Sequence, residues 1–255
     1  MKTVLITGAT SGIGEAIALR LAKENYKLIL TGRRDERLHI LKKRLESEYN
    51  ASVYTLCFDV REYSDAENAI NSLPDDWKRI DILVNNAGLA VGLSPLHEGV
   101  INDWERMINT NIKGLLFMTR IISPDMVVRK SGHIINVGSI AGKHVYPNGA
   151  VYCATKHAVD AISKGMRFDF LPYGIKVTQI CPGAVETEFS VVRFKGDKQR
   201  ADVVYEGYQS LVADDIADAV QYAISQPAHV NIQDLLIMPT AQANSNTFHK
   251  IKASQ

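Results

Sequence analysis

Thr7-Gly-Ala-Thr-Ser-Gly-Ile-Gly14 is the stretch that decides the fold, because it joins the apolar run Thr3–Thr7 to an amphipathic segment. Its glycines let the backbone turn tightly and approach an anion closely. The helix that follows offers free N–H groups and a favourable dipole to a phosphate. A turn of this kind after a first strand is typical of dinucleotide-binding domains, although the spacing is Gly-x-x-x-Gly-x-Gly instead of the commoner Gly-x-Gly-x-x-Gly. The residues expected to contact the dinucleotide here are Gly8, Thr10, Ser11, Gly12, Ile13 and Gly14.

Short apolar runs alternate with longer amphipathic stretches along the chain, a pattern typical of strand–helix units that build a parallel sheet. The apolar runs predict seven strands, at Thr3–Thr7, Lys27–Thr31, Ser52–Phe58, Ile80–Asn85, Gly132–Val137, Lys176–Cys181 and Asp234–Met238. The amphipathic stretches predict six helices, at Gly14–Asn25, Arg34–Tyr49, Ala66–Leu73, Asn102–Arg129, Val151–Phe170 and Ala213–Ser225. We therefore expect an α/β fold: a single Rossmann-type, doubly wound domain over residues 1–255, with a seven-stranded parallel sheet flanked by helices.

Two stretches near the C-terminus lack this regular pattern. Residues 184–211 form the least regular part, and a long irregular stretch in a compact domain is usually a lid or a binding loop. We interpret it as a substrate loop; the alternative is a loop ordered only by contacts between molecules. A polar tail follows at 241–255, and the part around Phe248 is a candidate for contact with a neighbouring subunit.

Composition limits the kinds of partner that the chain can have. Lys plus Arg number 29 and Asp plus Glu number 28, so no basic surplus points to nucleic acid or to an anionic membrane. No apolar run reaches the roughly 18 residues that a membrane helix needs, and the N-terminus is typical of a first strand. Cys57, Cys153 and Cys181 are far apart, which favours reduced thiols in the cytoplasm over disulfides or a metal site.

The end of the second predicted strand selects between nicotinamide cofactors. An acidic side chain there binds a ribose 2′-hydroxyl, whereas arginine accommodates a 2′-phosphate. This chain has Thr31-Gly-Arg-Arg34, and Asp35 comes only after both arginines. Arg33 and Arg34 can pair with a phosphate through forked, charge-assisted hydrogen bonds, or they are ordinary solvated residues at a helix start. We expect NADP(H).

Tyr152 and Lys156 lie four residues apart, so both side chains share one face of a predicted helix. A lysine ammonium beside a phenol favours the phenolate, which makes the tyrosine a usable acid or base near neutral pH. Such pairs also occur in many ordinary helices. Together with the glycine-rich turn and with Asn136-Val-Gly-Ser139 upstream, the pair indicates an enzyme of hydride transfer, which needs a proton source but no metal.

In order and spacing, these motifs resemble the short-chain dehydrogenase/reductase family along nearly the whole chain. The matching pieces are Thr7–Gly14, Asp59-Val60, Asn85-Asn-Ala-Gly88, Asn111-Ile-Lys-Gly114, Ser139, Tyr152, Lys156 and Pro182-Gly183. Ser139 precedes Tyr152 by thirteen residues, which is similar to the active-site interval of the family.

The resemblance implies a role for each matching residue. Asn111 would help to hold a proton-relay water, and Ser139 would bind the substrate oxygen. Tyr152 would exchange a proton with that oxygen, while Lys156 would hold the nicotinamide ribose and bias Tyr152 toward phenolate. The remaining matches would contact the cofactor: Asp59, Val60, Asn86, Ala87, Gly88, Pro182, Gly183, Val185 and Thr187.

The C-terminal third is similar to a subgroup that acts on short 3-hydroxy acids, which includes NADP-dependent serine or allo-threonine dehydrogenases and sulfoacetaldehyde reductases. The similarity lies in Glu186–Asp197, Pro227–Ile232 and Met238-Pro239. It implies a small anionic substrate: an acidic aldehyde and its alcohol, such as 3-hydroxypropionate, or the sulfonate pair sulfoacetaldehyde and isethionate. Arg193 is the candidate cation for the anion, and Tyr146 is a further candidate substrate contact.

Other functions and the assembly stay open at this stage. A regulatory protein that senses NADPH could keep the fold without the chemistry, although the complete set of four catalytic residues argues against it. A sugar-nucleotide epimerase or dehydratase could share the Tyr–Lys pair but usually carries a larger C-terminal region, and another carbonyl reductase of the same family is a further alternative. The family resemblance and the long helices 102–129 and 151–170 predict a homotetramer or a homodimer.

Overall fold

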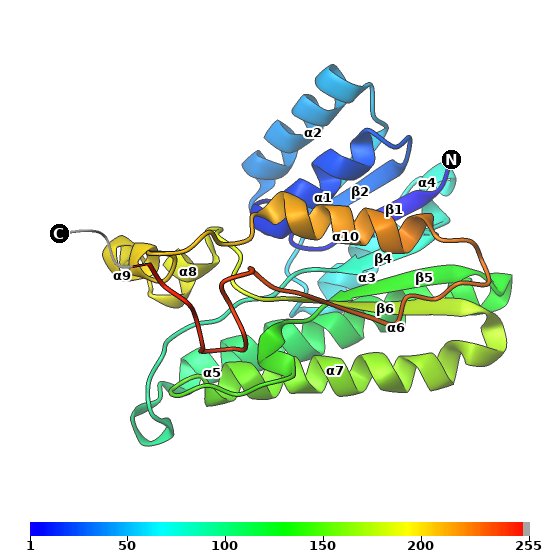
Figure 1. The fold of residues 1–255 in the computed structure, drawn as a ribbon. Helices are drawn as coiled ribbons and strands as arrows, with labels where there is room; N and C mark the ends of the chain where they lie inside the picture. Colours follow the sequence, from blue (N-terminus) through cyan, green and yellow to red (C-terminus); the bar gives the residue numbers. More distant parts are fainter. Residues whose placement is uncertain (252–255) are drawn as a thin grey trace.

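The structure, a computed structural model, describes residues 1–251, so residues 252–255 of the predicted tail lie outside the described residues (Figure 1). Seven strands form one parallel sheet in the order β3-β2-β1-β4-β5-β6-β7, which confirms the predicted fold class. The strands are β1 (Thr3–Ile6), β2 (Lys27–Gly32), β3 (Val53–Cys57), β4 (Ile82–Asn85), β5 (Gly132–Val137), β6 (Ile175–Pro182) and β7 (Asp234–Ile237).

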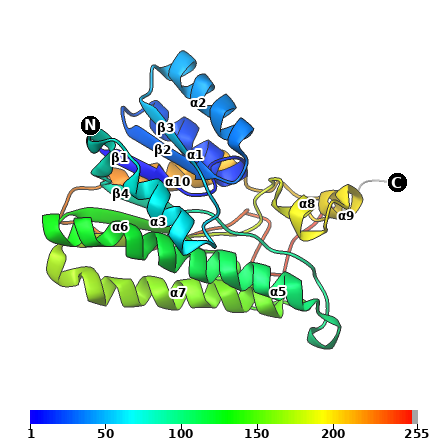
Figure 2. The same ribbon diagram turned by 180° about the vertical axis from the view of Figure 1, so that it is seen from behind.

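Helices cover both faces of the sheet: α1, α2 and α10 lie on one side, and α6 and α7 on the other (Figures 1 and 2). The helices are α1 (Gly12–Ala22), α2 (Asp35–Tyr49), α3 (Tyr63–Asn71), α4 (Asp75–Lys78), α5 (Ile101–Ile108), α6 (Leu115–Arg129), α7 (Ala150–Phe170), α8 (Phe189–Arg193), α9 (Lys198–Val203) and α10 (Ala213–Ser225). None of the helices within residues 1–251 is both long enough and apolar enough to cross a membrane.

The two layers of helices arise from the alternation of side chains along each strand. In β1, Val4 and Ile6 belong to the apolar core shared with α1 and α10. Leu5, between them, belongs to the core shared with α6 and α7. All three side chains are fully buried, which explains why the strand is an unbroken apolar run.

The predicted helix Asn102–Arg129 is wrong as one continuous α-helix, because the structure has α5, a π-helical segment at Asn109–Gly114, and then α6. Two contacts hold this segment away from a regular helical path. The Asn111 side chain bonds to the backbone of Leu89, and Gly114 lies so close to Val60 that a Cβ atom would be 2.8 Å from Val60 Cγ2. Tertiary contacts therefore override the helical period here.

The substrate loop is also more regular than its sequence indicates, since it contains the short helices α8 and α9. Val185 forms a parallel bridge with Leu211, so the two ends of the loop lie together just beyond the carboxyl end of β6. Its position matters because the order of the strands reverses between β1 and β4, and ligands of doubly wound sheets bind at the carboxyl ends beside such a point.

Candidate functional site

The glycine-rich turn after β1 has the conformation that its sequence predicts. Gly8 and Gly12 have φ values of +66° and +56°, where side chains other than glycine are strained. A Cβ atom on Gly14 would lie 2.4 Å from the Gly8 carbonyl oxygen, so the turn packs directly against the start of α1. Ser11, at the N-terminus of α1, makes no side-chain capping bond. The first N–H groups of α1 therefore stay available to an anion.

The segment after β4 packs against this turn through its own polar groups. Asn86 Nδ2 donates to the carbonyl oxygens of Thr7 and Gly8, at 2.9 and 3.2 Å. The backbone N–H of Ala87 donates to Thr7 Oγ1 at 3.0 Å. Asn86 thus holds two strand ends together, and its amide nitrogen is already used within the protein.

The arginines after β2 have different partners. Arg33 Nη1 lies 3.6 Å from Asp59 Oδ2, and Arg61 donates to the same carboxylate. Burial opposes ionisation of Asp59, but its hydrogen bonds with Arg61 and the charges of both arginines outweigh burial and hold the pKa of Asp59 below its usual value. Arg34 instead donates to Thr10 and Ser11 in the glycine-rich turn, and to Glu188 in the substrate loop.

Helix α7 presents Tyr152 and Lys156 one turn apart, both with less than a tenth of their surface exposed. Lys156 Nζ donates to the Val137 carbonyl oxygen at 2.9 Å, at the end of β5. Burial lowers the pKa of Lys156 to about 8. Ser139 begins the short turn after β5, and its hydroxyl oxygen accepts from the Ala141 N–H at 3.0 Å.

Burial raises the pKa of Tyr152, while the charge of Arg193 and a hydrogen bond with Ser139 act in the opposite direction. The Arg193 guanidinium carbon lies 5.1 Å from the centre of the Tyr152 ring. The cation that favours phenolate here is therefore Arg193, because Lys156 points to the Val137 carbonyl instead. The predicted bias of Tyr152 toward phenolate by Lys156 has no counterpart in these contacts.

Arg193 lies among three aromatic rings at the end of α8. Its guanidinium carbon is 5.5 Å from the ring centres of Tyr146 and Phe189, and its Nη2 donates to the Tyr146 hydroxyl oxygen. The Nε atom is a buried donor with no hydrogen-bond partner among the described residues. A buried, unsatisfied guanidinium N–H is costly, so the site favours an acceptor supplied from outside the chain.

Contacts with the body of the domain hold the loop that carries Arg193. The Gly92 N–H donates to the Arg193 carbonyl oxygen at 2.9 Å. Lys195, the second cation of the loop, pairs at 2.7 Å with the buried carboxylate of Asp103 on α5. Lys195 therefore has a protein partner, which leaves Arg193 as the better candidate for an external anion.

Asn111 lies in the π-helical segment, and its side chain is fully engaged with the protein. The amide oxygen accepts from the Leu89 N–H, and the amide nitrogen donates to the Leu89 carbonyl and to Thr155 Oγ1, at 2.8 to 3.0 Å. Gly88 packs between this side chain and Lys156, because a Cβ on Gly88 would lie 3.3 Å from Asn111 Oδ1 and 3.7 Å from Lys156 Nζ. The segment after β4 is thereby fixed beside α7.

A cleft of about 690 Å³ along the carboxyl ends of the strands brings the predicted site residues together. It contains the glycine-rich turn, Arg33 and Arg34, the Tyr152–Lys156 pair and Arg193. Of the predicted site residues, Gly14 and Asn111 do not line it: Gly14 is packed behind the turn, and Asn111 lies beneath Leu89.

Sequence reasoning missed several residues of the cleft. Phe189 packs edge-on against Tyr152 with ring centres 5.7 Å apart, and Glu188 bonds to Arg34. Gln242, in the C-terminal tail, accepts from the Ala184 N–H at 2.8 Å and covers the Pro182-Gly183 segment. Glu188 and Phe189 lie in the Glu186–Asp197 segment that resembles the 3-hydroxy acid subgroup, but the resemblance gives them no role, and no motif covers Gln242. Each acts through a partner that is distant in sequence.

The described part of the tail packs against its own chain, and its predicted contact with a neighbouring subunit stays a prediction. Phe248 packs against Tyr208 of its own chain, with ring centres 5.0 Å apart, and it lines the cleft together with Ser245 and Asn246. The tail therefore closes one side of the site within a single molecule.

Comparisons with known proteins agree with this geometry. The family model described as short chain dehydrogenase matches residues 2–198. A curated relative, the NADP-dependent 3-hydroxy acid dehydrogenase of Salmonella typhi, is 49% identical over 241 residues, which cover 94% of this chain and 96% of the relative. The NADP-dependent 3-hydroxy acid dehydrogenase of Schizosaccharomyces pombe is 42% identical and covers 99% of this chain and 98% of its own length.

Solved structures give the same result. A closed form of serine dehydrogenase complexed with NADP⁺ superposes with a TM-score of 0.91 at 46% identity, covering 98% of this chain and all of the other. The serine dehydrogenase of Escherichia coli has a TM-score of 0.80 at 43% identity, over 94% of this chain and 99% of its own. The sequence motifs, the sheet order and these matches together lead to one conclusion: the chain belongs to the short-chain dehydrogenase family of oxidoreductases.

Proposed function

We propose that this protein is an NADP(H)-dependent oxidoreductase that interconverts a short 3-hydroxy acid and the corresponding acidic carbonyl compound. Serine, allo-threonine and 3-hydroxypropionate are the candidate substrates. The names of the relatives from Salmonella typhi and Schizosaccharomyces pombe support both the cofactor and the class of substrate. We place the enzyme in the cytoplasm, which fractionation of the source cells would check.

The cleft suits a phosphorylated dinucleotide. The glycine-rich turn leaves no room for side chains where a pyrophosphate would approach, since a Cβ atom on Gly8 would lie 3.0 Å from Ala87 Cα. Arg33 and Arg34 supply cations where a 2′-phosphate would lie. Asp59, Val60, Gly88, Pro182, Gly183, Val185 and Thr187 are proposed as further contacts. When bound, NADPH supplies the hydride that reduces the carbonyl carbon.

Ser139 and Tyr152 are proposed to act on the substrate oxygen. The Ser139 hydroxyl donates a hydrogen bond to that oxygen and holds it beside the phenol. Tyr152 then transfers its proton to the oxygen during reduction, and takes a proton from the alcohol during oxidation. The raised pKa of Tyr152 keeps the phenol protonated at neutral pH, which suits the reductive direction.

Lys156 is proposed to hold the nicotinamide ribose by donating hydrogen bonds from its ammonium group. Its buried position next to Gly88, at the floor of the cleft, fits this role. Asn111 keeps the same floor in place through Leu89 and Thr155.

The unsatisfied Arg193 Nε carries the assignment of an acidic substrate. A carboxylate at Arg193 would accept two parallel hydrogen bonds and would point the other end of a three-carbon substrate toward Tyr152. A sulfonate could be held in the same way, so charge alone does not distinguish the two acids.

The test compares malonic semialdehyde with propanal, its neutral analogue, in steady-state oxidation of NADPH by the wild type and by Arg193→Ala. With the acid, kcat/KM of the variant is expected to fall by an amount that corresponds to about 2–5 kcal/mol of transition-state stabilisation, as for a buried ion pair that loses one partner. Its activity with propanal should change little. Equal losses with both aldehydes would show that Arg193 has only a structural role. Faster turnover of sulfoacetaldehyde than of malonic semialdehyde would reassign the substrate to the sulfonate.

Tyr152→Phe separates an enzyme from a protein that merely senses NADPH. The variant keeps the ring but has no exchangeable proton, so turnover should fall roughly 100-fold or more while NADPH binding persists. A wild type that binds NADPH without oxidising it in the presence of any of these aldehydes would support the regulatory alternative.

A further inference from the structure

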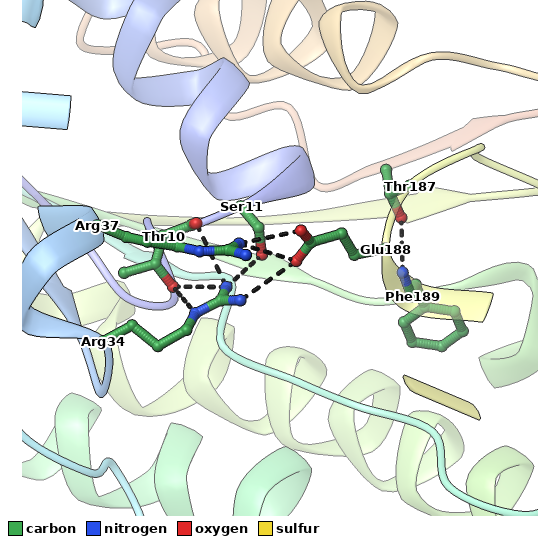
Figure 3. A network of polar contacts seen from close by, with 7 residues as sticks. All are labelled: Thr10, Ser11, Arg34, Arg37, Thr187, Glu188 and Phe189. Atoms are coloured by element: carbon green, nitrogen blue, oxygen red, sulfur yellow. Dashed lines mark hydrogen bonds and ion pairs between the residues drawn. The ribbon is translucent and has the colours of Figure 1, made fainter. Parts of the chain in front are cut away.

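Glu188 forms an ion-pair bridge between two arginines at the phosphate end of the cleft (Figure 3). Its carboxylate accepts from Arg34 Nη1 at 3.2 Å, and from Arg37 Nη1 at 3.0 and 3.1 Å. The partners lie 154 and 151 residues away in sequence, so the bridge joins the start of α2 to the substrate loop. Arg37 has no place in the sequence motifs and does not itself line the cleft, and its bond with Glu188 is what connects it to the lining.

Arg34 is prepared for an anion by the glycine-rich turn. Its Nη2 donates to Thr10 Oγ1 and Ser11 Oγ at 2.8 and 2.7 Å, which fixes the guanidinium plane beside the N-terminus of α1. Figure 3 shows Glu188 reaching the Nη1 edge of the Arg34 guanidinium from the side of the substrate loop. The neighbouring Thr187 packs on the turn itself, since a Cβ on Gly12 would lie 3.3 Å from Thr187 Cβ.

The guanidinium edges that Glu188 occupies are the donors that a 2′-phosphate needs. A carboxylate and a phosphate oxygen make the same forked hydrogen bonds with arginine. Both groups cannot use one edge, and two anions at such a distance repel each other. We propose that Glu188 is a specificity residue that competes with the 2′-phosphate of NADP(H) for Arg34 and Arg37, which makes Arg37 a third cation of the phosphate site; this proposal rests on the cofactor assigned above.

The competition is one that the phosphate should win. Arg34, Arg37 and Glu188 have 43%, 46% and 50% of their side chains exposed, and ion pairs in such positions are weak. A phosphate monoester carries more negative charge than a carboxylate, with three oxygens to accept from several donors. Glu188 therefore holds the arginines in place and neutralises them without the cofactor, at the cost of some affinity for the 2′-phosphate.

Calorimetric titration of the full chain with adenosine 2′,5′-bisphosphate tests this competition. Adenosine 5′-monophosphate is the matched probe, because it differs only in lacking the 2′-phosphate. Glu188→Gln should bind the bisphosphate about 3- to 10-fold more tightly than the wild type, and the monophosphate within about twofold of it. Arg37→Gln should weaken binding of the bisphosphate. When Glu188→Gln is added to Arg37→Gln, the gain in affinity should be smaller than in the wild type, because one of the donors for which Glu188 competes is gone.

Glu186→Gln is the control for net charge. Glu186 lies two residues earlier on the same segment, and its carboxylate accepts from Ser210 instead of from an arginine. This variant should bind both probes as the wild type does. A similar gain with Glu186→Gln would show that the effect is a general change of charge, which would overturn the specific competition.

The outcomes separate this proposal from the function on which it rests. A wild type that binds both probes equally well would refute NADP(H) as the cofactor, and the competition with it. A wild type that prefers the bisphosphate, together with Glu188→Gln that binds it equally or more weakly, would overturn the role of Glu188 alone and leave NADP(H) in place.

Discussion

At the scale of single residues, Lys156 shows how the site trades stability for chemistry. Burial removes water from the ammonium group and makes its charged form less stable, which lowers the pKa of Lys156 from 10.5 to about 8. Below pH 8 the folded protein holds a charged group that prefers water. As the pH rises from 8 to 10.5, the unfolded chain binds more protons than the native one at this site, so the penalty is relieved.

Lys156→Met should therefore be more stable than the wild type at pH 7, by up to about 3 kcal/mol, while turnover is lost. The difference should shrink to about 1 kcal/mol at pH 10. Urea denaturation of both proteins at the two pH values measures it. Lys164→Met, an exposed position on the same helix, is the control and should show no such pH-dependent difference. If the difference in the free energy of unfolding between wild type and Lys156→Met stays constant with pH, burial does not lower the pKa of Lys156.

The residues that the sequence predicted well are those fixed by local spacing. Tyr152 and Lys156 share a face because any α-helix would place them so, and Ser139 reaches them because β5 ends beside α7. Glu188 and Arg37 could not be predicted in this way, since their contact depends on how the substrate loop folds back over α2. An ion pair between exposed side chains leaves no pattern in either segment.

At the scale of elements, the glycine-rich turn is the most constrained piece of backbone in the site. Gly14→Ala would place a methyl group 2.4 Å from the Gly8 carbonyl oxygen and 2.5 Å from Asn86 Nδ2, and the nearer of these is backbone that cannot turn aside. We expect a loss of about 1–3 kcal/mol of stability, together with weaker binding of adenosine 2′,5′-bisphosphate, because the turn that faces the phosphates must shift.

Gly165→Ala in α7 is the matched control for this change. A Cβ on Gly165 meets nothing within 4 Å. Alanine in the interior of a helix is more stabilising than glycine by about 0.5–1 kcal/mol. Thermal denaturation should show a gain for Gly165→Ala and a loss for Gly14→Ala. Equal effects of the two variants would contradict the close packing of the turn.

Elements were predicted best where burial is uniform. The central strands β1, β2, β4, β5 and β6 are apolar runs with mostly buried side chains, whereas the edge strands β3 and β7 are partly exposed. The order in the sheet follows the chain only from β4 to β7. The interruption between α5 and α6 could not be predicted, because its cause is the contact of Asn111 with Leu89 and of Gly114 with Val60. Helices α8 and α9 are short enough that loop composition hides them.

At the scale of the whole molecule, exposed apolar side chains on and next to α6 and α7 favour self-association. Phe168 near the end of α7 and Leu171 just after it are 78% and 75% exposed, and Val128 near the end of α6 is 82% exposed. Apolar side chains gathered on one surface often mark an interface, and we propose that these three belong to one. We expect a homotetramer or a homodimer that buries these residues.

Light scattering at micromolar concentration should report a mass of two or four chains. Phe168→Asp with Leu171→Asp should reduce that mass, because two charges would be buried without partners. Ile40→Asp, at an apolar position on α2 that is 67% exposed, should leave it unchanged. A monomeric wild type would refute the assembly.

The π-helical segment Asn109–Gly114 has a consequence for how this molecule tolerates changes of length. A π turn holds one residue more than an α turn of the same span, so α5 and α6 are joined with a shift of phase between their faces. Deletion of one residue here would therefore leave an unbroken α-helix in which α5 and α6 keep their faces, so Leu115 and Met118 would stay in the core and the change would fall on the contact of Asn111 with Leu89. The same deletion inside α6 would instead rotate everything on one side by roughly 100° about the helix axis. Because of the extra residue, α6 can pack into the core while Asn111, in the π-helical segment, contacts Leu89 beside the cleft.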